Sequence, residues 1–257
     1  MIGLLSWNMQ AGVSAYGEPV AQAQSLWLQK NGTELLALQE IDLPLLSLLQ
    51  EQLPDYHWHF APARSGWIDG RWQTLGNAIA TRLPFGSVEA RVLPQPHTLA
   101  ALHMPRSALM LAINEPRPFT LITTHLEYHC PQQRQSQLQD LQQWHQDAVA
   151  QQRYASLAPE GFYQAVAWPS PLLLCGDLNL PWGSAEYQWL LDQGWIDAGG
   201  EQPPLTCGVF DTQQWPQGPH CRDYMLANAE LAPRLGRLWS DAHNPLSDHQ
   251  PLFLELS

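Results

Sequence analysis

Lysine is almost absent from this sequence, and charge of any kind is scarce. The 257 residues include a single lysine, Lys30, and the 12 basic side chains face 24 acidic ones, so the formal net charge is −12. A protein that coats nucleic acid needs a basic surface to displace counterions, and this composition argues against that class. It leaves open a pocket in which a metal ion supplies the positive charge.

The sequence also lacks paired cysteines and long apolar runs. Its four cysteines show neither CxxC spacing nor the density of a secreted disulfide scaffold, although Cys207 and Cys221 flank one loop and could pair in an oxidising compartment. No stretch reaches the roughly 18 apolar residues of a membrane span, and the first residues lack the basic region of a signal peptide. We therefore expect a cytoplasmic protein with no transmembrane segment and no obligate protein partner.

Apolar and aromatic residues are abundant instead. Hydrophobic residues make up 45% of the chain and 12 residues are tryptophans, a composition that excludes disorder. The length suits a single α/β domain over residues 1–257. Many short apolar runs and few helices favour two packed sheets flanked by helices over a Rossmann alternation. The runs expected to form strands are Ile2–Trp7, Leu35–Gln39, His57–Ala61, Asn77–Thr81, Ala108–Ile113, Thr120–Thr124, Leu172–Cys175, Asp223–Ala227, Leu235–Ser240 and Pro251–Leu256.

Three helices are expected from the apolar period and from proline in a first turn. The first is expected to begin at Glu18-Pro19, the second to cover about Asp42 to Leu53, and the third to extend from Pro131 to about Tyr154. Residues 64–72 and 203–221 are rich in glycine, proline and tryptophan, and we expect both to be long surface loops. Long ordered loops often border binding sites.

Polar residues stand at the ends of several expected strands. They are Asn8, Glu40, His125, Asp177, Asn179, Asp223, Asp248 and His249. Strand ends present side chains to a shared cleft, and carboxylate and amide oxygens suit Mg²⁺ or Mn²⁺. Taken singly, Glu40 is more often a helix cap or a solvated residue, and Asp177 an Asx turn before Pro181. The whole set in one chain favours a metal-centred site.

These residues lie in short motifs that together resemble a known superfamily. The motifs are Ser6-Trp7-Asn8, Leu38-Gln39-Glu40, Gly76–Arg82, Thr124-His125-Leu126, Gly176–Asn179, Arg222-Asp223-Tyr224 and Ser247–Pro251. In this order they resemble the endonuclease/exonuclease/phosphatase superfamily, Mg²⁺-dependent phosphoesterases similar to DNase I. The resemblance implies a four-layer α/β/β/α sandwich of two mixed β-sheets, with the site where the sheets open.

The same resemblance implies roles for the site residues. Glu40 is the main metal ligand, Asn8 lies beside it, and Asp248 is near the metal or at a second metal position. Asp177 is similar to the carboxylate that aligns or deprotonates the attacking water, and Asn179 to the amide that holds a phosphate oxygen. His249, paired with Asp223, and His125 are similar to the two histidines that assist catalysis.

Two further residues are weaker candidates for substrate binding. Arg106 precedes a strand and could clamp a phosphate, although solvation at the surface fits it equally well. Asn77 could support the site or serve only a turn. Abasic-site nucleases tend to carry an acidic residue where this chain has Gln10, and a different aromatic where it has His125. Both departures favour the phosphatase-like or general phosphodiesterase branches.

The leading hypothesis is a Mg²⁺- or Mn²⁺-dependent hydrolase of phosphate esters, a phosphodiesterase first of all. Hydrolysis spreads negative charge over the phosphoryl and leaving oxygens, and a metal at Glu40 would stabilise that charge during in-line attack of water. The substrate stays open between nucleic acid and a small-molecule or lipid phosphodiester. The alternatives are a lipid or inositol phosphate phosphoesterase of the same superfamily, and a non-catalytic binding protein that retained the fold.

Overall fold

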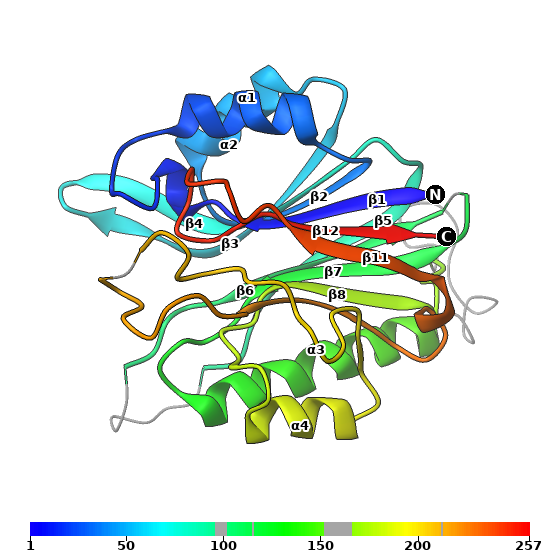
Figure 1. Ribbon diagram of the computed structural model, residues 1–257. Helices are drawn as coiled ribbons and strands as arrows, with labels where there is room; N and C mark the ends of the chain where they lie inside the picture. Colours follow the sequence, from blue (N-terminus) through cyan, green and yellow to red (C-terminus); the bar gives the residue numbers. More distant parts are fainter. Residues whose placement is uncertain (96–101, 115, 152–165, 212) are drawn as a thin grey trace.

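The computed structural model describes residues 1–95, 102–114, 116–151, 166–211 and 213–257. Two mixed sheets of six strands each lie face to face in this part of the chain (Figure 1). Helices α1 (Ala21–Asn31) and α2 (Leu43–Gln52) cover the outer face of one sheet. Helices α3 (Pro131–Gln151) and α4 (Ala185–Asp192) cover the outer face of the other. The predicted four-layer α/β/β/α sandwich is confirmed.

The first sheet has the strand order β11-β12-β1-β2-β4-β3, and the second has the order β5-β6-β7-β8-β10-β9. The strands of the first sheet are β1 (Ile2–Asn8), β2 (Leu35–Asp42), β3 (His57–Ile68), β4 (Arg71–Thr81), β11 (Leu235–Ser240) and β12 (Leu252–Leu256). Those of the second are β5 (Phe85–Val92), β6 (Ser107–Ile113), β7 (Phe119–His125), β8 (Leu172–Asp177), β9 (Ile196–Asp197) and β10 (Asp223–Ala227).

The central strands are apolar along their whole length because both faces of each sheet are covered. In β1, Leu4 packs into the core between the two sheets, while its neighbour Leu5 packs against α1 and α2. In β8, Leu173 faces the core between the sheets and Leu174 faces α3 and α4. Successive side chains of a strand point to opposite faces, and here both faces are buried.

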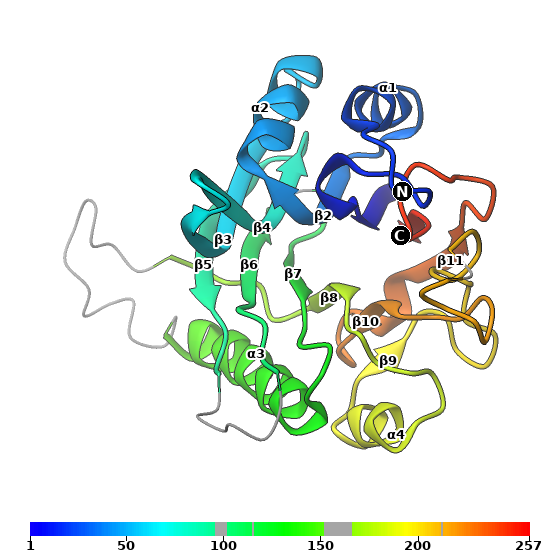
Figure 2. The same cartoon turned by 90° about the vertical axis from the view of Figure 1, so that its left-hand side faces the viewer.

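Strand pairing brings the ends of distant strands to one edge of the sandwich. β1 and β2 are parallel, as are β7 and β8, so each pair ends on the same side. β10 is antiparallel to β8, and its first residue, Asp223, pairs with Asp177. Figure 2 looks onto this edge, with α1 and α2 above it and α3 and α4 below.

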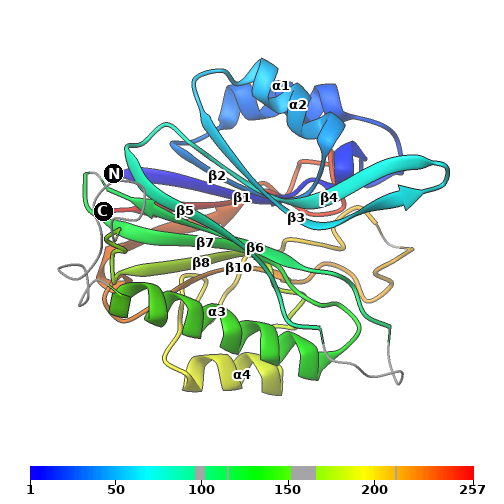
Figure 3. The same ribbon diagram turned by 180° about the vertical axis from the view of Figure 1, so that it is seen from behind.

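Residues 64–72 do not form the expected surface loop. They are the outer part of the β3–β4 hairpin, in which Trp67 pairs with Trp72 around the turn Asp69-Gly70. Both turn residues have positive φ, 50° and 76°, and Asp-Gly is a strong signal for this kind of hairpin turn. The hairpin projects past the helices at the edge where β1 ends, as Figures 1 and 3 show.

Several other boundaries differ from expectation. Helix α1 begins at Ala21 rather than at Glu18-Pro19, because Pro19 forms a β-bridge with Val13 and Val20 is the N-cap. Strand β5, strand β9 and helix α4 were not expected. Ser184 caps α4 by accepting a hydrogen bond from the backbone N–H of Tyr187, a signal that the sequence does contain.

The remaining expectations concern residues outside regular structure. The part of 203–221 that the structure describes forms no helix and only isolated bridges, as expected for a loop. Cys207 and Cys221 are free thiols. The expected end of the third helix, near Tyr154, lies outside the described residues. No helix in the described part of the chain combines the length and apolar character that crossing a membrane would require.

Candidate active site

Asn8 is the last residue of β1, and Glu40 lies two residues before the end of the parallel strand β2. The Nδ2 of Asn8 donates to Glu40 Oε1 at 3.3 Å and to Asp177 Oδ2 at 3.1 Å, which joins the two sheets. Glu40 has a φ of +52°, and the pairing of β2 with β4 shifts register between Leu38 and Ile41. A left-handed residue at a bulge re-aims its side chain, and such strain in a non-glycine residue is common at functional sites.

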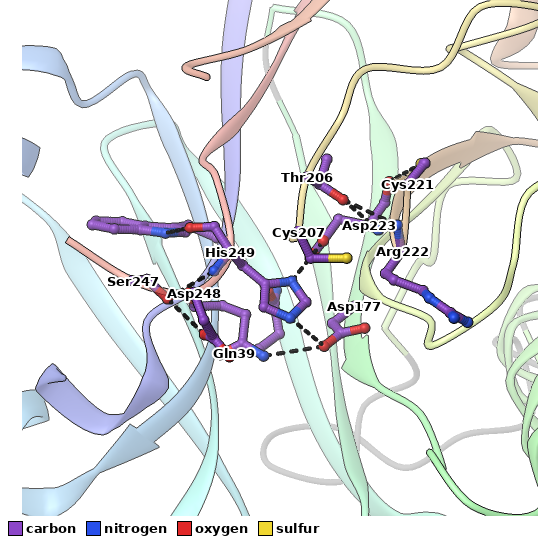
Figure 4. A network of polar contacts seen from close by, with 12 residues as sticks. Gln39, Asp177, Thr206, Cys207, Cys221, Arg222, Asp223, Ser247, Asp248 and His249 are labelled. Atoms are coloured by element: carbon purple, nitrogen blue, oxygen red, sulfur yellow. Dashed lines mark hydrogen bonds and ion pairs between the residues drawn. The ribbon is translucent and has the colours of Figure 1, made fainter. Parts of the chain in front are cut away.

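His249 lies between two buried carboxylates from the second sheet (Figure 4). Its Nδ1 is 2.8 Å from Asp223 Oδ2, and its Nε2 is 3.6 Å from Asp177 Oδ2. The carboxylate of Asp223 fixes the imidazole with its Nδ1–H donating, so Nε2 faces the centre of the site. Burial opposes the charged imidazolium, but the charges of Asp223 and Asp177 outweigh it and raise the pKa of His249 well above its ordinary value.

His125 lies on the other side of the same carboxylate, at the end of β7. Its Nε2 is 3.2 Å from Asp177 Oδ2 and 3.0 Å from Asn179 Nδ2. Burial and the nearby charge of Arg106 lower the pKa of His125 to about 3, so this ring is neutral at pH 7. The two histidines beside Asp177 therefore differ in charge, which is how neighbouring groups of one site take on different roles.

The segment after β8 places Asp177 and Asn179. The backbone N–H of Asn179 donates to Asp177 Oδ1 at 3.0 Å, and the Nδ2 of Asn179 donates to the carbonyl oxygen of Leu126 at 3.0 Å. Asn179 has a φ of +52°, a conformation that asparagine tolerates better than most residues. This Asx-type turn and the candidate site therefore use the same residues.

Asp248 approaches the site from the loop before β12. Its Oδ1 lies 3.2 Å from Ser247 Oγ, and Ser247 Oγ accepts a hydrogen bond from the backbone N–H of His249 at 3.2 Å. Ser247 Oγ also lies 2.7 Å from the carbonyl oxygen of Asn8, to which it donates. The loop that carries Asp248 and His249 is thus fixed to the end of β1.

A cavity of about 410 Å³ opens beside Glu40 and His125. One wall is the β3–β4 hairpin and the other is the segment that leads into β6. Arg106 lines it, is 5% exposed, and has an Nε with no hydrogen-bond partner among the described residues. Arg106 is therefore buried rather than solvated, and a guanidinium in this position can bind an anion that enters the cavity.

Asn77 also borders the cavity, but its amide is already engaged. The Nδ2 donates to the backbone carbonyl of Ser107 at 2.8 Å and lies 3.3 Å from Ser107 Oγ. Ser107 Oγ in turn donates to the carbonyl oxygen of Ala61 at 2.9 Å. Asn77 therefore connects β4 to the start of β6 and supports the wall next to Arg106.

The donor atoms around Glu40 suit a hard divalent cation. Burial, and next the negative charge of Asp248, raise the pKa of Glu40 above its ordinary value. A buried carboxylate whose negative charge is opposed by a neighbouring carboxylate is a fitting ligand for Mg²⁺ or Mn²⁺, which prefer oxygen ligands. Asn8 stands next to Glu40 and could complete the set.

Ligand atoms of Asp177, Asp223 and His249 also lie within 4.8 Å of one another. The 2.8 Å hydrogen bond between His249 Nδ1 and Asp223 Oδ2 leaves His249 Nε2 and the other carboxylate oxygens as the free donors of this second cluster. One of its three ligands would be an imidazole nitrogen, which suits Mg²⁺ and Mn²⁺ less well than an oxygen ligand. The pair Glu40 and Asp248 is the better candidate.

Several residues that build the site were not among the candidate site residues named from the sequence. Ser247 links two loops, and Gln39 donates to Ser6 Oγ in its own sheet and to Thr123 Oγ1 in the other sheet. Arg222 donates to the carbonyl oxygen of Asn179 at 3.1 Å and lies over the ring of Trp215. Ser247, Gln39 and Arg222 all lie in the quoted motifs, so their position beside the candidate residues was the available signal.

The chain belongs to the Endonuclease/Exonuclease/phosphatase family, whose sequence profile matches residues 5–249. Membership supports a phosphoesterase activity and places the chain among the hydrolases. The family is generally dependent on divalent metal ions, which agrees with the donor set around Glu40. No curated protein is a significant match to the chain.

Solved structures of the same fold have little sequence in common with this chain. A mannosyl-6-phosphatase from Bacteroides thetaiotaomicron is 15% identical, covers 100% of both chains and has a TM-score of 0.74. TDP2 from D. rerio, solved with a single-strand DNA product, is 20% identical, covers 100% of this chain and 98% of its own, and has a TM-score of 0.65. A family member from Beutenbergia cavernae is 16% identical, covers 100% of this chain and 72% of its own, and has a TM-score of 0.70. At these identities the likeness establishes the fold.

Proposed function

We propose that this chain is a Mg²⁺- or Mn²⁺-dependent phosphodiesterase. The observation that carries the proposal is the arrangement around Asp177, whose Oδ2 lies 3.2 Å from a neutral histidine and 3.6 Å from a histidine with a raised pKa. Opposite it stand the carboxylates of Glu40 and Asp248. A phosphoryl group between them would meet a base, a proton donor and a metal position at once.

The chain's own residues can carry the proton transfers of hydrolysis. Asp177 would orient the attacking water and accept its proton as the oxygen bonds to phosphorus. His249 would donate a hydrogen bond from Nε2 to a phosphoryl oxygen, with Asp223 stabilising its positive charge. His125 and Asn179 would hold the phosphoryl oxygens in line, and Arg106 would bind another of them.

A divalent ion held by Glu40, Asp248 and Asn8 would supply Lewis acidity and neutralise charge on the phosphoryl and leaving oxygens. The rest of the stabilisation would come from fixed hydrogen-bond donors in a buried site. Such donors are effective because they need no reorganisation during the reaction.

Cavities on two sides of the site favour a diester over a monoester. The cavity beside Arg106 has a volume of about 410 Å³, and a second one of about 460 Å³ is lined by Pro181, Trp182 and Arg222 among others. Arg222 contacts the backbone of Asn179, so the second cavity begins next to the turn after Asp177. A phosphodiester carries two ester groups, and each cavity could receive one.

Two substrate classes are candidates: a nucleic acid, and a small-molecule or lipid phosphodiester. The net charge of −12 is unfavourable for tight, non-specific binding of long DNA. The related fold serves a sugar phosphatase in one neighbour and a protein that binds single-stranded DNA product in another. A small-molecule or lipid phosphodiester fits the charge of this chain better than a long nucleic acid.

A panel of substrates with and without EDTA tests the proposal. It would compare bis(p-nitrophenyl) phosphate, p-nitrophenyl phosphate, single- and double-stranded DNA, RNA, phosphoinositides and sphingomyelin, each with Mg²⁺ or Mn²⁺. We expect the diester to be cleaved faster than the monoester, and His249→Ala and Asp177→Ala to lower kcat by roughly 10² or more.

Matched controls are available elsewhere in the chain. His145 is a buried histidine of α3 that contacts the carbonyl oxygen of Pro169, and Asp197 is a half-buried aspartate that accepts from the hydroxyl of Tyr187. His145→Ala and Asp197→Asn should leave kcat within a factor of about 3, the range of small structural effects. Metal-independent turnover, or near-normal turnover of folded His249→Ala, would overturn the mechanism.

A further inference from the structure

Glu127, a glutamate with no exposed surface, lies two residues after His125. Both of its carboxylate oxygens are occupied by backbone donors. Oε2 accepts from the N–H of Met104 at 2.7 Å, and Oε1 accepts from the N–H of His129 at 2.7 Å. Burying a carboxylate is costly unless it is fully hydrogen-bonded. These two hydrogen bonds explain how the fold can bury Glu127, but they do not explain what the carboxylate contributes there.

The two backbone donors belong to loops that approach the candidate site from different directions. Met104 lies in the segment that leads into β6, and this segment forms one wall of the cavity beside Glu40. His129 lies between β7, which ends at His125, and α3. Glu127 therefore fixes the cavity wall to the strand that carries His125.

Met104 also contacts Arg106. The Nη2 of Arg106 lies 3.3 Å from Met104 Sδ, while the Nε of Arg106 is buried and has no partner among the described residues. Burial lowers the pKa of the Arg106 guanidinium, and the negative charges of Asp177, Glu40 and, least of the three, Glu127 act in the opposite direction. Glu127 thus acts on Arg106 in two ways, through the backbone of Met104 and through its own charge.

Glu127 is itself held by the helices of the second sheet. Its N–H donates to Gln137 Oε1 at 2.9 Å, and its carbonyl oxygen accepts from Arg134 Nη1 at 2.7 Å. Arg134 makes two further contacts with the carboxylate of Glu186, at 3.0 and 2.8 Å. The backbone of Glu127 is therefore fixed to α3 and, through Arg134, to α4.

We propose that Glu127 is a positioning residue that holds Arg106 in place to bind the phosphoryl group of the substrate. This inference rests on the proposed function, because it takes the phosphoryl group as the ligand of Arg106. Glu127 does not touch the substrate. It keeps the guanidinium of Arg106 directed into the cavity, where Nε is available for the substrate.

The alternative is a purely structural role, in which Glu127 only satisfies two loop amides. The two roles differ in their coupling to Arg106. If Glu127 acts through Arg106, its replacement should matter little once Arg106 has been removed. If Glu127 only stabilises the fold, the two replacements should lower activity by independent factors, which multiply.

The test is a double-mutant cycle of Glu127→Gln and Arg106→Gln, assayed on bis(p-nitrophenyl) phosphate with Mg²⁺. Glutamine keeps the shape of Glu127 but presents an N–H₂ group to one of the two backbone donors. We expect Glu127→Gln alone to lower kcat/KM by about 10-fold or more, since a displacement near 1 Å costs on the order of 10²-fold. In the Arg106→Gln background it should lower kcat/KM by less than about 3-fold.

Two variants separate positioning from loss of stability. Leu141→Ala opens a cavity in the fully buried core under α3, and should lower the melting temperature while kcat/KM stays within a factor of about 3. Met104→Leu retains the backbone donor but removes the sulfur contact to Arg106. We expect it to lower kcat/KM by about 10-fold, beyond the factor of about 3 allowed to the control, and by less than about 3-fold in the Arg106→Gln background. If Glu127→Gln does not fold, Glu127→Asp, which keeps the charge on a shorter side chain, replaces it in the cycle.

A binding measurement keeps this inference separable from the proposed function. Calorimetry with inorganic phosphate should show weaker binding to Glu127→Gln and Arg106→Gln than to the wild type. Hydrogen exchange at the Met104 amide should be faster in Glu127→Gln and unchanged in Leu141→Ala. If the wild type hydrolyses no ester in the panel, the proposed function fails, and these two measurements still judge the positioning role. Unchanged phosphate affinity and exchange, or independent factors in the cycle, would overturn it.

Discussion

Gly176 occupies a position in β8 where both the backbone conformation and the neighbouring strand require glycine. Its φ is +133°, and a Cβ built there would lie 2.0 Å from the carbonyl oxygen of Thr124 on the neighbouring strand β7. An ordinary contact begins at 3.4 Å, so Gly176→Ala requires the two strands to separate by more than 1 Å. The next residues along these strands are His125 and Asp177, which pair with each other.

The expected cost has two parts. Forcing alanine into a conformation that L-residues avoid costs about 1–2 kcal/mol, and overpacking a tight contact costs about 1–3 kcal/mol. Gly176→Ala should therefore lower the free energy of unfolding by about 2–5 kcal/mol, which for a chain of this length corresponds to roughly 5–15 °C in Tm. The 3.2 Å contact of His125 with Asp177 would also open, and kcat should fall by at least about 10-fold.

Two other glycines separate the causes. Gly66 has no atom within 4 Å of a built Cβ and no positive φ, so Gly66→Ala should leave Tm unchanged. Gly183 has a φ of +72° and the same open surroundings, so Gly183→Ala should cost only about 1 kcal/mol from the backbone. Differential scanning calorimetry and steady-state kinetics on the three variants measure both effects. A Gly176→Ala protein as stable as Gly183→Ala would refute the steric argument.

Two more predictions concern charge at the site. Because Asp223 raises the pKa of His249 above its ordinary value, this pair contributes stability that is fully present below about pH 6.5 and is lost as the pH rises through the raised pKa. In EDTA, the destabilisation caused by Asp223→Asn should therefore be largest below pH 6.5 and smaller above it, measured by urea unfolding at several pH values; a destabilisation that grew with pH would contradict this. Saturating Mg²⁺, at about 100 times its Kd, should stabilise the wild type by about 2.7 kcal/mol, and Glu40→Gln should lose most of this shift in a thermal melt while Asp223→Asn keeps it. The opposite pattern would move the metal to the cluster of Asp177, Asp223 and His249.

The sheets could be predicted from the sequence because their strands are buried on both faces. Runs such as Leu172–Cys175 are continuously apolar, and each is followed at once by a polar residue or by glycine and aspartate. Strand β5 and the outer hairpin are different, because they lie at sheet edges and much of their surface is exposed. An exposed edge needs no apolar pattern, so only turn residues such as Asp69-Gly70 marked it.

The candidate residues could be found for a related reason. Asn8, His125 and Asp177 each end a buried strand, and parallel pairing alone brings such ends to one edge. What the sequence could not supply is the charge state of each histidine. His125 and His249 are equally buried, yet the pKa of one falls and that of the other rises, because Arg106 lies near the first and Asp223 contacts the second.

Glu127 marks the limit of reasoning from strand ends. It stands beside His125 in the sequence, but its partners are Met104, 23 residues earlier, and His129. Nothing in the spacing of these residues indicates that one carboxylate joins their backbones, because backbone N–H groups are present at almost every position. A side chain that acts by holding another segment can be recognised only once the fold has placed both segments, and for that reason it must be tested by its coupling to Arg106 rather than by its own loss.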